Sequence, residues 1–117
     1  MKKTHPYIPT EYEEQCTFVD WLEVKGLKFT AIPNSTYTTS YSQKRKNWAT
    51  GLRPGLPDLL VITPKGLAFI EMKRTKKSHT SPEHKEWVDL LNKCPGVEAR
   101  ICYGAQEAIH FISELLC

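Results

Sequence analysis

The sequence of 117 residues lacks several features that would assign it to a specialised class of protein. It has no apolar run near the roughly 18 residues that a membrane-spanning helix needs, so a transmembrane protein is excluded. No apolar segment follows the charged residues at the start, which predicts a cytoplasmic protein without a secretion signal, in the host cytoplasm if the chain is viral. The four cysteines show neither C-x-x-C spacing nor a Cys/His cluster, which excludes the usual zinc-site patterns.

The composition that remains is that of an ordinary folded chain. It is 40% hydrophobic, 10% aromatic and 25% charged, which predicts a single globular domain over residues 1–117. Pro6 and Pro9 oppose a helix, so residues 1–9 are expected to form an extended N-terminal arm. Cys16, Cys94 and Cys102 fall within apolar patterns and are expected to be reduced thiols in the core.

Positive charge is concentrated in the middle of the chain. The net charge is only +3, yet residues 44–85 contain ten basic and three acidic side chains. Such a segment suits a polyanion such as DNA, although a solvated basic face is the simpler alternative. The candidate DNA-binding residues are the basic side chains of the long loop and of the second basic stretch: Lys44, Arg45, Lys46, Arg53, Arg74, Lys76 and Lys77.

Local signals predict the element order α-β-β-β-α-β-α. A capping box at Thr10 and Glu13 begins a helix that ends before Gly26, and Ser81-Pro82 begins a second helix. Strands are expected over residues 28–32, 58–63, 67–73 and 97–103, and a last helix follows Gly104. Residues 35–54 are expected to form a long basic loop, with at most a short helix near 44–49.

The first helix carries two polar side chains on its apolar stripe. At 100° per residue, Glu11 and Gln15 align with Phe18 and Leu22, whereas Glu13 points away. A carboxylate and an amide on the buried side of a helix indicate a site at that end of the helix.

A second set of charged residues lies at the open end of the hairpin formed by strands 58–63 and 67–73. Asp58 begins one strand, and Glu71 and Lys73 end the other on a shared face. A two-residue connection places Asp58 directly opposite Glu71, and a three-residue connection makes them diagonal neighbours. Two carboxylates with backbone or water oxygens suit Mg²⁺ or Mn²⁺, and an adjacent ammonium can orient or deprotonate an activated water.

Together these residues resemble the PD-(D/E)XK nuclease superfamily and, within it, a stand-alone VRR-NUC domain. The resemblance rests on Gly-Leu-Pro-Asp-Leu at 55–59, Phe-Ile-Glu-Met-Lys at 69–73, Pro33-Asn34 and the helix with Glu11 and Gln15. It covers nearly the whole chain. It implies an α/β fold with an αβββαβ(α) core, in which helices flank a mixed central sheet.

The resemblance also implies roles for individual residues. Asp58 and Glu71 would bind Mg²⁺ or Mn²⁺ together with the Met72 carbonyl, and Lys73 would be the catalytic lysine. Gln15 matches the polar residue of the family's first helix, and Glu11 is its usual companion. His84 stands where the family commonly has a glutamine; it is either a core histidine or a contact to DNA or to a metal ligand.

The resemblance implies a metal-dependent endonuclease with structure-specific cleavage, for which branched DNA such as a four-way junction is the expected substrate. Alternatives are a nuclease directed to flaps or to a sequence, or a non-catalytic DNA-binding module. A four-way junction requires paired cuts, so a homodimer is expected. The apolar last helix suggests that its outer residues, Phe111 among them, form part of the dimer interface; the alternative is that this helix is simply buried in the core.

Overall fold

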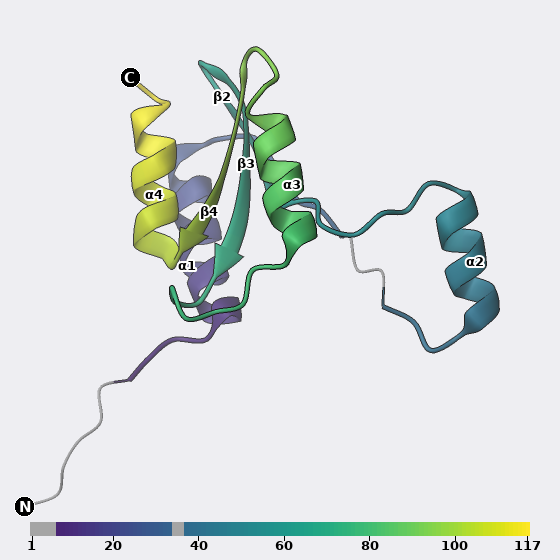
Figure 1. Cartoon of the computed structure of the whole chain (residues 1–117). Coiled ribbons are helices and arrows are strands. Elements are labelled where there is room, and N and C mark those ends of the chain that lie inside the picture. The colour runs from purple at the N-terminus through teal and green to yellow at the C-terminus, as the bar shows by residue number, and fades with distance from the viewer. Residues whose placement is uncertain (1–6, 34–36) are drawn as a thin grey trace, which may run out of the picture.

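The structure is a computed structural model that describes residues 7–33 and 37–117. It contains a four-stranded sheet and four helices (Figure 1). In chain order the elements are α1 (Glu11–Lys25), β1 (Phe29–Ala31), α2 (Tyr41–Ala49), β2 (Leu59–Thr63), β3 (Gly66–Lys73), α3 (Pro82–Leu91), β4 (Val97–Tyr103) and α4 (Ala105–Glu114). The predicted αβββαβ(α) order is confirmed, with α2 added between the first two strands.

Helix ends follow the predicted capping residues. Thr10 and Glu13 form the reciprocal capping box of α1, and Gly26 ends that helix in the left-handed region at φ +70°. Ser81 caps α3, with Pro82 as its first residue. α2 begins earlier than the short helix considered near 44–49, because the Ser40 hydroxyl accepts the Gln43 backbone N–H and caps a helix from Tyr41.

The sheet has the order β1-β2-β3-β4. β1, β2 and β3 pair antiparallel, whereas β4 lies parallel to β3. In the hairpin Thr63 is opposite Gly66 and Leu59 is opposite Ile70, so the connection is the two-residue one. Continuing this register by one position sets Asp58 opposite Glu71.

Helices cover both faces of the sheet. α1 and α4 pack on one face, and α3 lies on the other (Figure 1). The buried core lies under α1 and α4 and comprises Phe18, Leu22, Leu59, Val61, Ala68, Ile70, Met72, Cys102, Ala105, Ala108, Phe111, Ile112 and Leu115. Side-chain alternation along β3 directs Glu71 away from this core, toward the α3 face. Trp87, Val88 and Leu91 of α3 are only partly buried.

A contact from α1 holds the start of α4. The Glu14 carboxylate accepts a 2.8 Å hydrogen bond from the Ala105 backbone N–H. Gly104 precedes it with φ +94°, and a Cβ there would lie 2.6 Å from Glu14 Oε2. Glutamate from one helix thus satisfies a free N–H group at the N-terminus of another, which explains the glycine at this position.

Three expectations about burial are wrong. Phe111 is 1% exposed, and the Arg100 guanidinium covers its ring at 4.4 Å, so it is a core residue and not part of an outer interface. Cys16 and Cys94 are exposed, and only Cys102 lies in the core as expected. Apolar periodicity predicts which residues share a helix face, but the neighbouring elements decide how much of that face is covered.

α2 stands away from the sheet and the other helices (Figure 1). None of its residues is buried, and Tyr41 and Trp48 are 75% and 61% exposed. In the described part of the chain, no helix has the length and apolar character needed to cross a membrane.

Candidate active site

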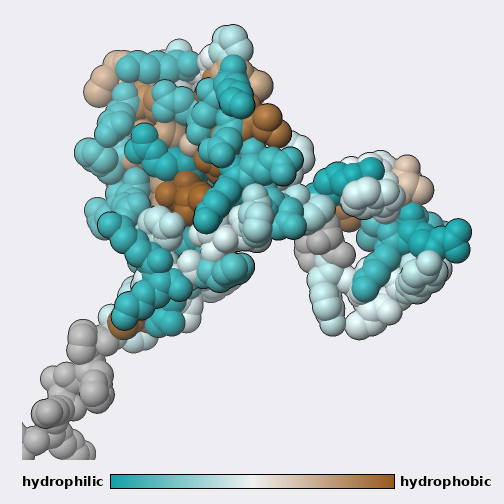
Figure 2. Space-filling model, in the orientation of Figure 1, coloured by the Kyte–Doolittle hydropathy of each residue, from teal (hydrophilic) through white to brown (hydrophobic). Residues whose placement is uncertain are grey.

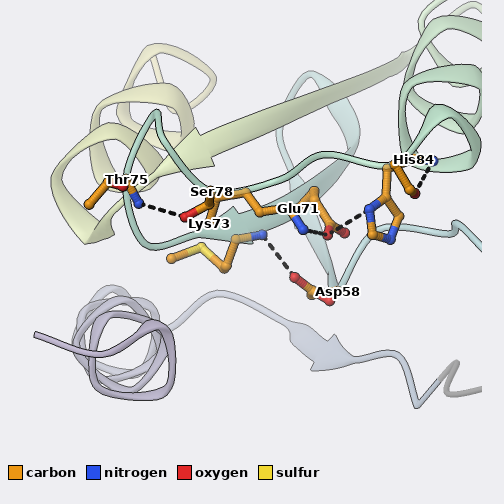
Figure 3. A network of polar contacts seen from close by, with 8 residues as sticks. Asp58, Glu71, Lys73, Thr75, Ser78 and His84 are labelled. Atoms are coloured by element: carbon orange, nitrogen blue, oxygen red, sulfur yellow. Dashed lines mark hydrogen bonds and ion pairs between the residues drawn. The ribbon is translucent and has the colours of Figure 1, made fainter.

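Asp58, Glu71 and Lys73 meet at the open end of the β2–β3 hairpin. Asp58 immediately precedes β2, and its Oδ2 accepts a 2.8 Å hydrogen bond from the Met72 backbone N–H. Glu71 is 2% exposed, and its Oε2 lies 3.2 Å from Lys73 Nζ. Figure 3 shows Glu71 between Lys73 and His84, with Asp58 beside them. The hairpin therefore brings two carboxylates and an ammonium together from residues separated in the sequence.

The first turn of α3 supplies a fourth group. The Ser81 hydroxyl accepts the His84 backbone N–H, which fixes His84 at the start of the helix. The His84 Nδ1 atom lies 3.3 Å from Glu71 Oε2. Of the two readings left open by the sequence, the core histidine is wrong, since the His84 side chain remains 24% exposed and faces a site carboxylate. The serine-proline cap determines where the helix begins, but only the packing of α3 against the sheet shows the contact between His84 and Glu71.

The segment before Asp58 is fastened to α3. The Trp87 indole N–H donates a 2.9 Å hydrogen bond to the Pro54 carbonyl. Gly55 adopts φ +109°, and a Cβ there would lie 2.7 Å from both Glu83 Cβ and Trp87 Cδ1. The glycine of the Gly-Leu-Pro-Asp-Leu segment is required by this close approach. It lets the chain run against α3 directly before the first carboxylate.

Burial raises the pKa values of both carboxyl groups, Asp58 and Glu71. Burial, assisted by the nearby negative charge of Asp58, raises the pKa of Glu71 to about 7, against the opposing effect of Lys73. The pKa of Asp58 is also raised by burial, and the Met72 N–H and Lys73 partly counteract this. Burial and the positive charge of Lys73 lower the pKa of His84. The site thus favours an arrangement in which an added positive charge would be stabilising.

Of the two polar residues on the α1 stripe, Glu11 lies within electrostatic reach of the hairpin. Its pKa is raised by partial burial, while Lys73 lowers it and Asp58 raises it. Gln15 is half-buried and borders a hollow of about 230 Å³ with Tyr12 and Cys16. In the residues that the structure describes, no hydrogen bond joins the Gln15 amide to the carboxylates.

The site residues fit a small hard cation. Glu71 Oε1 and His84 Nδ1 are both buried and have no hydrogen-bond partner within residues 7–33 and 37–117. No cluster of three or more His, Cys, Asp or Glu side chains capable of holding a metal occurs in these residues. Two carboxylates and one backbone carbonyl nevertheless match Mg²⁺, which keeps several water ligands in proteins. Met72 can offer only its backbone, because its side chain is in the core.

The basic residues predicted to bind DNA lie on two separate segments. Lys44, Arg45 and Lys46 are exposed on α2, where Figure 2 shows hydrophilic surface on the projecting segment. The Arg53 guanidinium stacks 3.4 Å from the centre of the Trp48 ring and donates to the Trp48 carbonyl. These basic side chains are not gathered around the carboxylates but extend to one side of them.

The second basic stretch follows β3. Lys76 and Lys77 are exposed, whereas Arg74 is occupied by the N-terminal arm. Its Nε and Nη2 donate to the carbonyls of Pro9 and Ile8 at 2.9 and 3.0 Å. Asn34, which contributed to the resemblance, lies outside the described residues, as do residues 1–6 of the predicted arm.

Comparison with known proteins agrees with this architecture. The VRR-NUC domain family matches residues 3–106 of the sequence. A solved structure described as a "VRR_NUC domain protein" superposes with a TM-score of 0.75 at 23% identity, covering 94% of this chain and 90% of that one. No curated protein matches the chain. The chain belongs to the VRR-NUC domain family, and it therefore has the fold of a nuclease domain that processes DNA.

Proposed function

We propose that the protein is a Mg²⁺- or Mn²⁺-dependent endonuclease that cuts branched DNA, with four-way junctions as the preferred substrate. The observation that carries this proposal is the buried Glu71 carboxylate, which lies beside Asp58 and Lys73 with one oxygen free of hydrogen bonds among the described residues. A fold can persist without activity. A buried glutamate beside a half-buried aspartate and a lysine is costly to keep unless the group binds something.

Each residue of the site has a distinct role in this proposal. Asp58, Glu71 and the Met72 carbonyl hold the cation, which when bound supplies Lewis-acid activation of the phosphodiester. Lys73 holds the attacking water near the carboxylates through its ammonium group, which already lies 3.2 Å from Glu71. Glu11 and Gln15 orient water or a ligand from the start of α1, and Glu11 has the closer electrostatic connection to the site.

DNA affinity is assigned to the basic segments. Residues 37–54 contain Lys44, Arg45, Lys46 and Arg53 and no acidic residue. We call this segment the α2 arm. Because the arm is exposed and projects beside the site, it can reach phosphates that lie several nucleotides from the cut. Lys76 and Lys77 add contacts nearer the site, and Arg74 contributes chiefly by holding the N-terminal arm.

The active species is proposed to be a homodimer. One hairpin end offers one cation site and cuts one strand, whereas a four-way junction requires cuts in two opposed strands. An isologous dimer supplies two sites related by the symmetry of such a junction. Light scattering at micromolar concentration measures the assembly directly. A monomer that cuts both opposed strands within one binding event would contradict the proposal.

The function is tested by incubating the protein with labelled four-way junction, flap and plain duplex DNA, with Mg²⁺, with Mn²⁺ and with EDTA. The proposal expects metal-dependent cuts in the junction at a rate above that of the other substrates. Preferential cutting of flaps, or of duplex at one sequence, would instead support the alternative nuclease specificities. Binding without cutting under every metal condition would support the DNA-binding module and overturn the proposed activity.

A further inference from the structure

His84 belongs to the site but has no role in the function proposed above. His84 approaches Glu71 from α3, opposite the side from which Lys73 approaches (Figure 3). Both contacts are made to the same carboxylate oxygen, Oε2, at 3.2 Å from Lys73 Nζ and 3.3 Å from His84 Nδ1. The other oxygen, Oε1, is left buried and without a hydrogen bond in the described chain.

We infer that His84 is a positioning residue that holds the Glu71 carboxylate through Nδ1, so that Oε1 is presented to the cation. The inference rests on the proposed function for the identity of the cation and deepens it. It assigns the orientation of the Glu71 carboxylate, which belongs to β3, to a histidine that belongs to α3. Groups that orient a metal ligand in this way set metal affinity and activity.

The local structure favours this role over that of a loosely placed surface histidine. Ser81 caps α3 through the His84 backbone N–H, and Trp87 joins the same helix to Pro54. The imidazole is therefore carried by a helix that is anchored beside the segment leading into Asp58. The tautomer with hydrogen on Nδ1 places a donor against Oε2, whereas the other tautomer opposes two lone pairs.

The present contact is close but poorly aligned, so Nδ1 does not yet make a hydrogen bond. Catalytic contacts of this kind commonly tighten when the other components bind. Lys73, Asp58 and Glu83 are the other charged groups that act on His84, and none of them occupies the Nδ1 position.

Side-chain shape supplies a direct test. The amide nitrogen of asparagine occupies nearly the position of histidine Nδ1, whereas that of glutamine occupies nearly the position of Nε2. We therefore compare His84→Ala, His84→Asn and His84→Gln. His110→Ala serves as the matched control, because His110 is 76% exposed on α4 and pairs with Glu114.

The first measurement is calorimetric titration with Mn²⁺ in the absence of DNA. His84→Ala is expected to weaken Mn²⁺ binding by roughly tenfold or more. His84→Asn is expected to restore most of the affinity, and His84→Gln less. The control is expected to bind as the wild type does. Circular dichroism confirms that each variant is folded, and the two amide variants keep the comparison valid if alanine disturbs α3.

The second measurement is single-turnover cleavage of the four-way junction as a function of Mg²⁺ concentration. His84→Ala should need more Mg²⁺ for half-maximal rate while its dissociation constant for DNA in Ca²⁺ stays unchanged. Wild-type Mn²⁺ and Mg²⁺ dependence in His84→Ala would overturn the inference. So would full rescue by glutamine without rescue by asparagine, because that result assigns the function to Nε2.

The two proposals fail in different ways. If the wild type binds Mn²⁺ with the predicted dependence on residue 84 but cuts no DNA, the endonuclease activity is wrong and the role of His84 stands. If the wild type cuts DNA with Mg²⁺ and His84→Ala is indistinguishable from it, the role of His84 is wrong and the activity stands. If the wild type binds no Mn²⁺ and cuts no DNA with Mg²⁺ or Mn²⁺, both are wrong.

Discussion

The Asp58 carboxylate accepts a hydrogen bond from the backbone N–H of Met72, the residue that follows Glu71 in β3. The β2–β3 pairing ends at Leu59 and Ile70. Beyond it, the Asp58 side chain supplies the acceptor for the Met72 N–H that a backbone carbonyl would supply if the pairing continued. The bond ties one carboxylate of the site to the strand that carries the other. Asp58 consequently stabilises the end of the hairpin in addition to its proposed role as a cation ligand, and its variants must be chosen to separate the two.

Asparagine at position 58 keeps an acceptor for the Met72 N–H but removes the charge. Asp58→Asn, Glu71→Gln and Lys73→Ala are each expected to lower single-turnover cleavage by roughly a hundredfold or more, with the fold intact. DNA affinity, measured without a cleavage-supporting metal, should be kept, and it should rise slightly where a negative charge is lost. Lys65→Ala, in the turn at the far end of the hairpin, is the control. Near wild-type turnover in any of the three would contradict the assignment.

Substitutions at the start of α1 are expected to have smaller effects. Glu11→Gln should reduce the cleavage rate by less than Asp58→Asn, because the proposed role of Glu11 is to orient water or a ligand and not to hold the cation itself. Gln15→Ala should have the weaker effect of the two, since it makes no hydrogen bond to the carboxylates among the described residues. The measurement is the single-turnover rate across a Mg²⁺ titration. Unchanged rates in both variants would remove this helix end from the site.

The raised pKa of Glu71 makes stability depend on pH. Its folded-state pKa of about 7 exceeds the unfolded value of 4.5, so the folded state favours the protonated carboxyl. Its contribution is therefore most favourable below pH 4.5 and is lost as pH rises through 7. In EDTA, raising the pH from below 4.5 to well above 7 should lower the free energy of unfolding by on the order of 3 kcal/mol from this group alone.

Denaturant unfolding at several pH values tests this prediction. Glu71→Gln should flatten the pH dependence, whereas Glu98→Gln, at an exposed position of β4, should not. Added Mn²⁺ should recover stability most strongly above pH 7, where both carboxylates can ionise and bind it. An equal pH dependence in wild type and Glu71→Gln would show that Glu71 ionises normally in the folded state.

The α2 arm should govern affinity and not chemistry. Replacing Lys44, Arg45 and Lys46 with alanine is expected to raise the dissociation constant for every DNA shape. It should also reduce the slope of log affinity against log salt concentration by about 0.9 per lost phosphate contact. The rate at saturating DNA should change little. A matched triple alanine variant at Lys28, Lys65 and Lys93 removes the same charge elsewhere. If the two triple variants weaken DNA binding equally, the basic residues of the α2 arm are only a solvated basic surface and not a DNA-binding segment.

The two glycines before Asp58 offer a matched pair. Gly51 and Gly55 have similar positive φ angles, +101° and +109°, but only Gly55 lies against α3. Gly51→Ala should cost about 1–2 kcal/mol for the backbone conformation alone. Gly55→Ala should cost about 1–3 kcal/mol more from overpacking against Glu83 and Trp87. It should also lower cleavage, because the segment leading into Asp58 must move. Denaturant unfolding and single-turnover rates of both variants measure the difference.

Local sequence signals determined most of the secondary structure. Capping residues at Thr10 and Ser81 fixed where α1 and α3 begin, because they satisfy backbone N–H groups within a few residues of themselves. Alternating side chains fixed which residues of the hairpin share a face, and the short turn limited its register to two choices. Those constraints left Asp58 either directly opposite Glu71 or diagonal to it, and the two-residue connection of the structure sets the two directly opposite each other.

Only the tertiary structure decided which elements cover these faces. Glu14 reaches Ala105, Arg74 reaches the carbonyls of Ile8 and Pro9, and His84 reaches Glu71, in each case across a long stretch of chain or between different elements. Phe111 looked like surface because its helix is rich in apolar residues, yet Arg100 covers it. The physical reason is that capping and alternation are properties of neighbouring residues, whereas burial and partner choice depend on how separate elements pack.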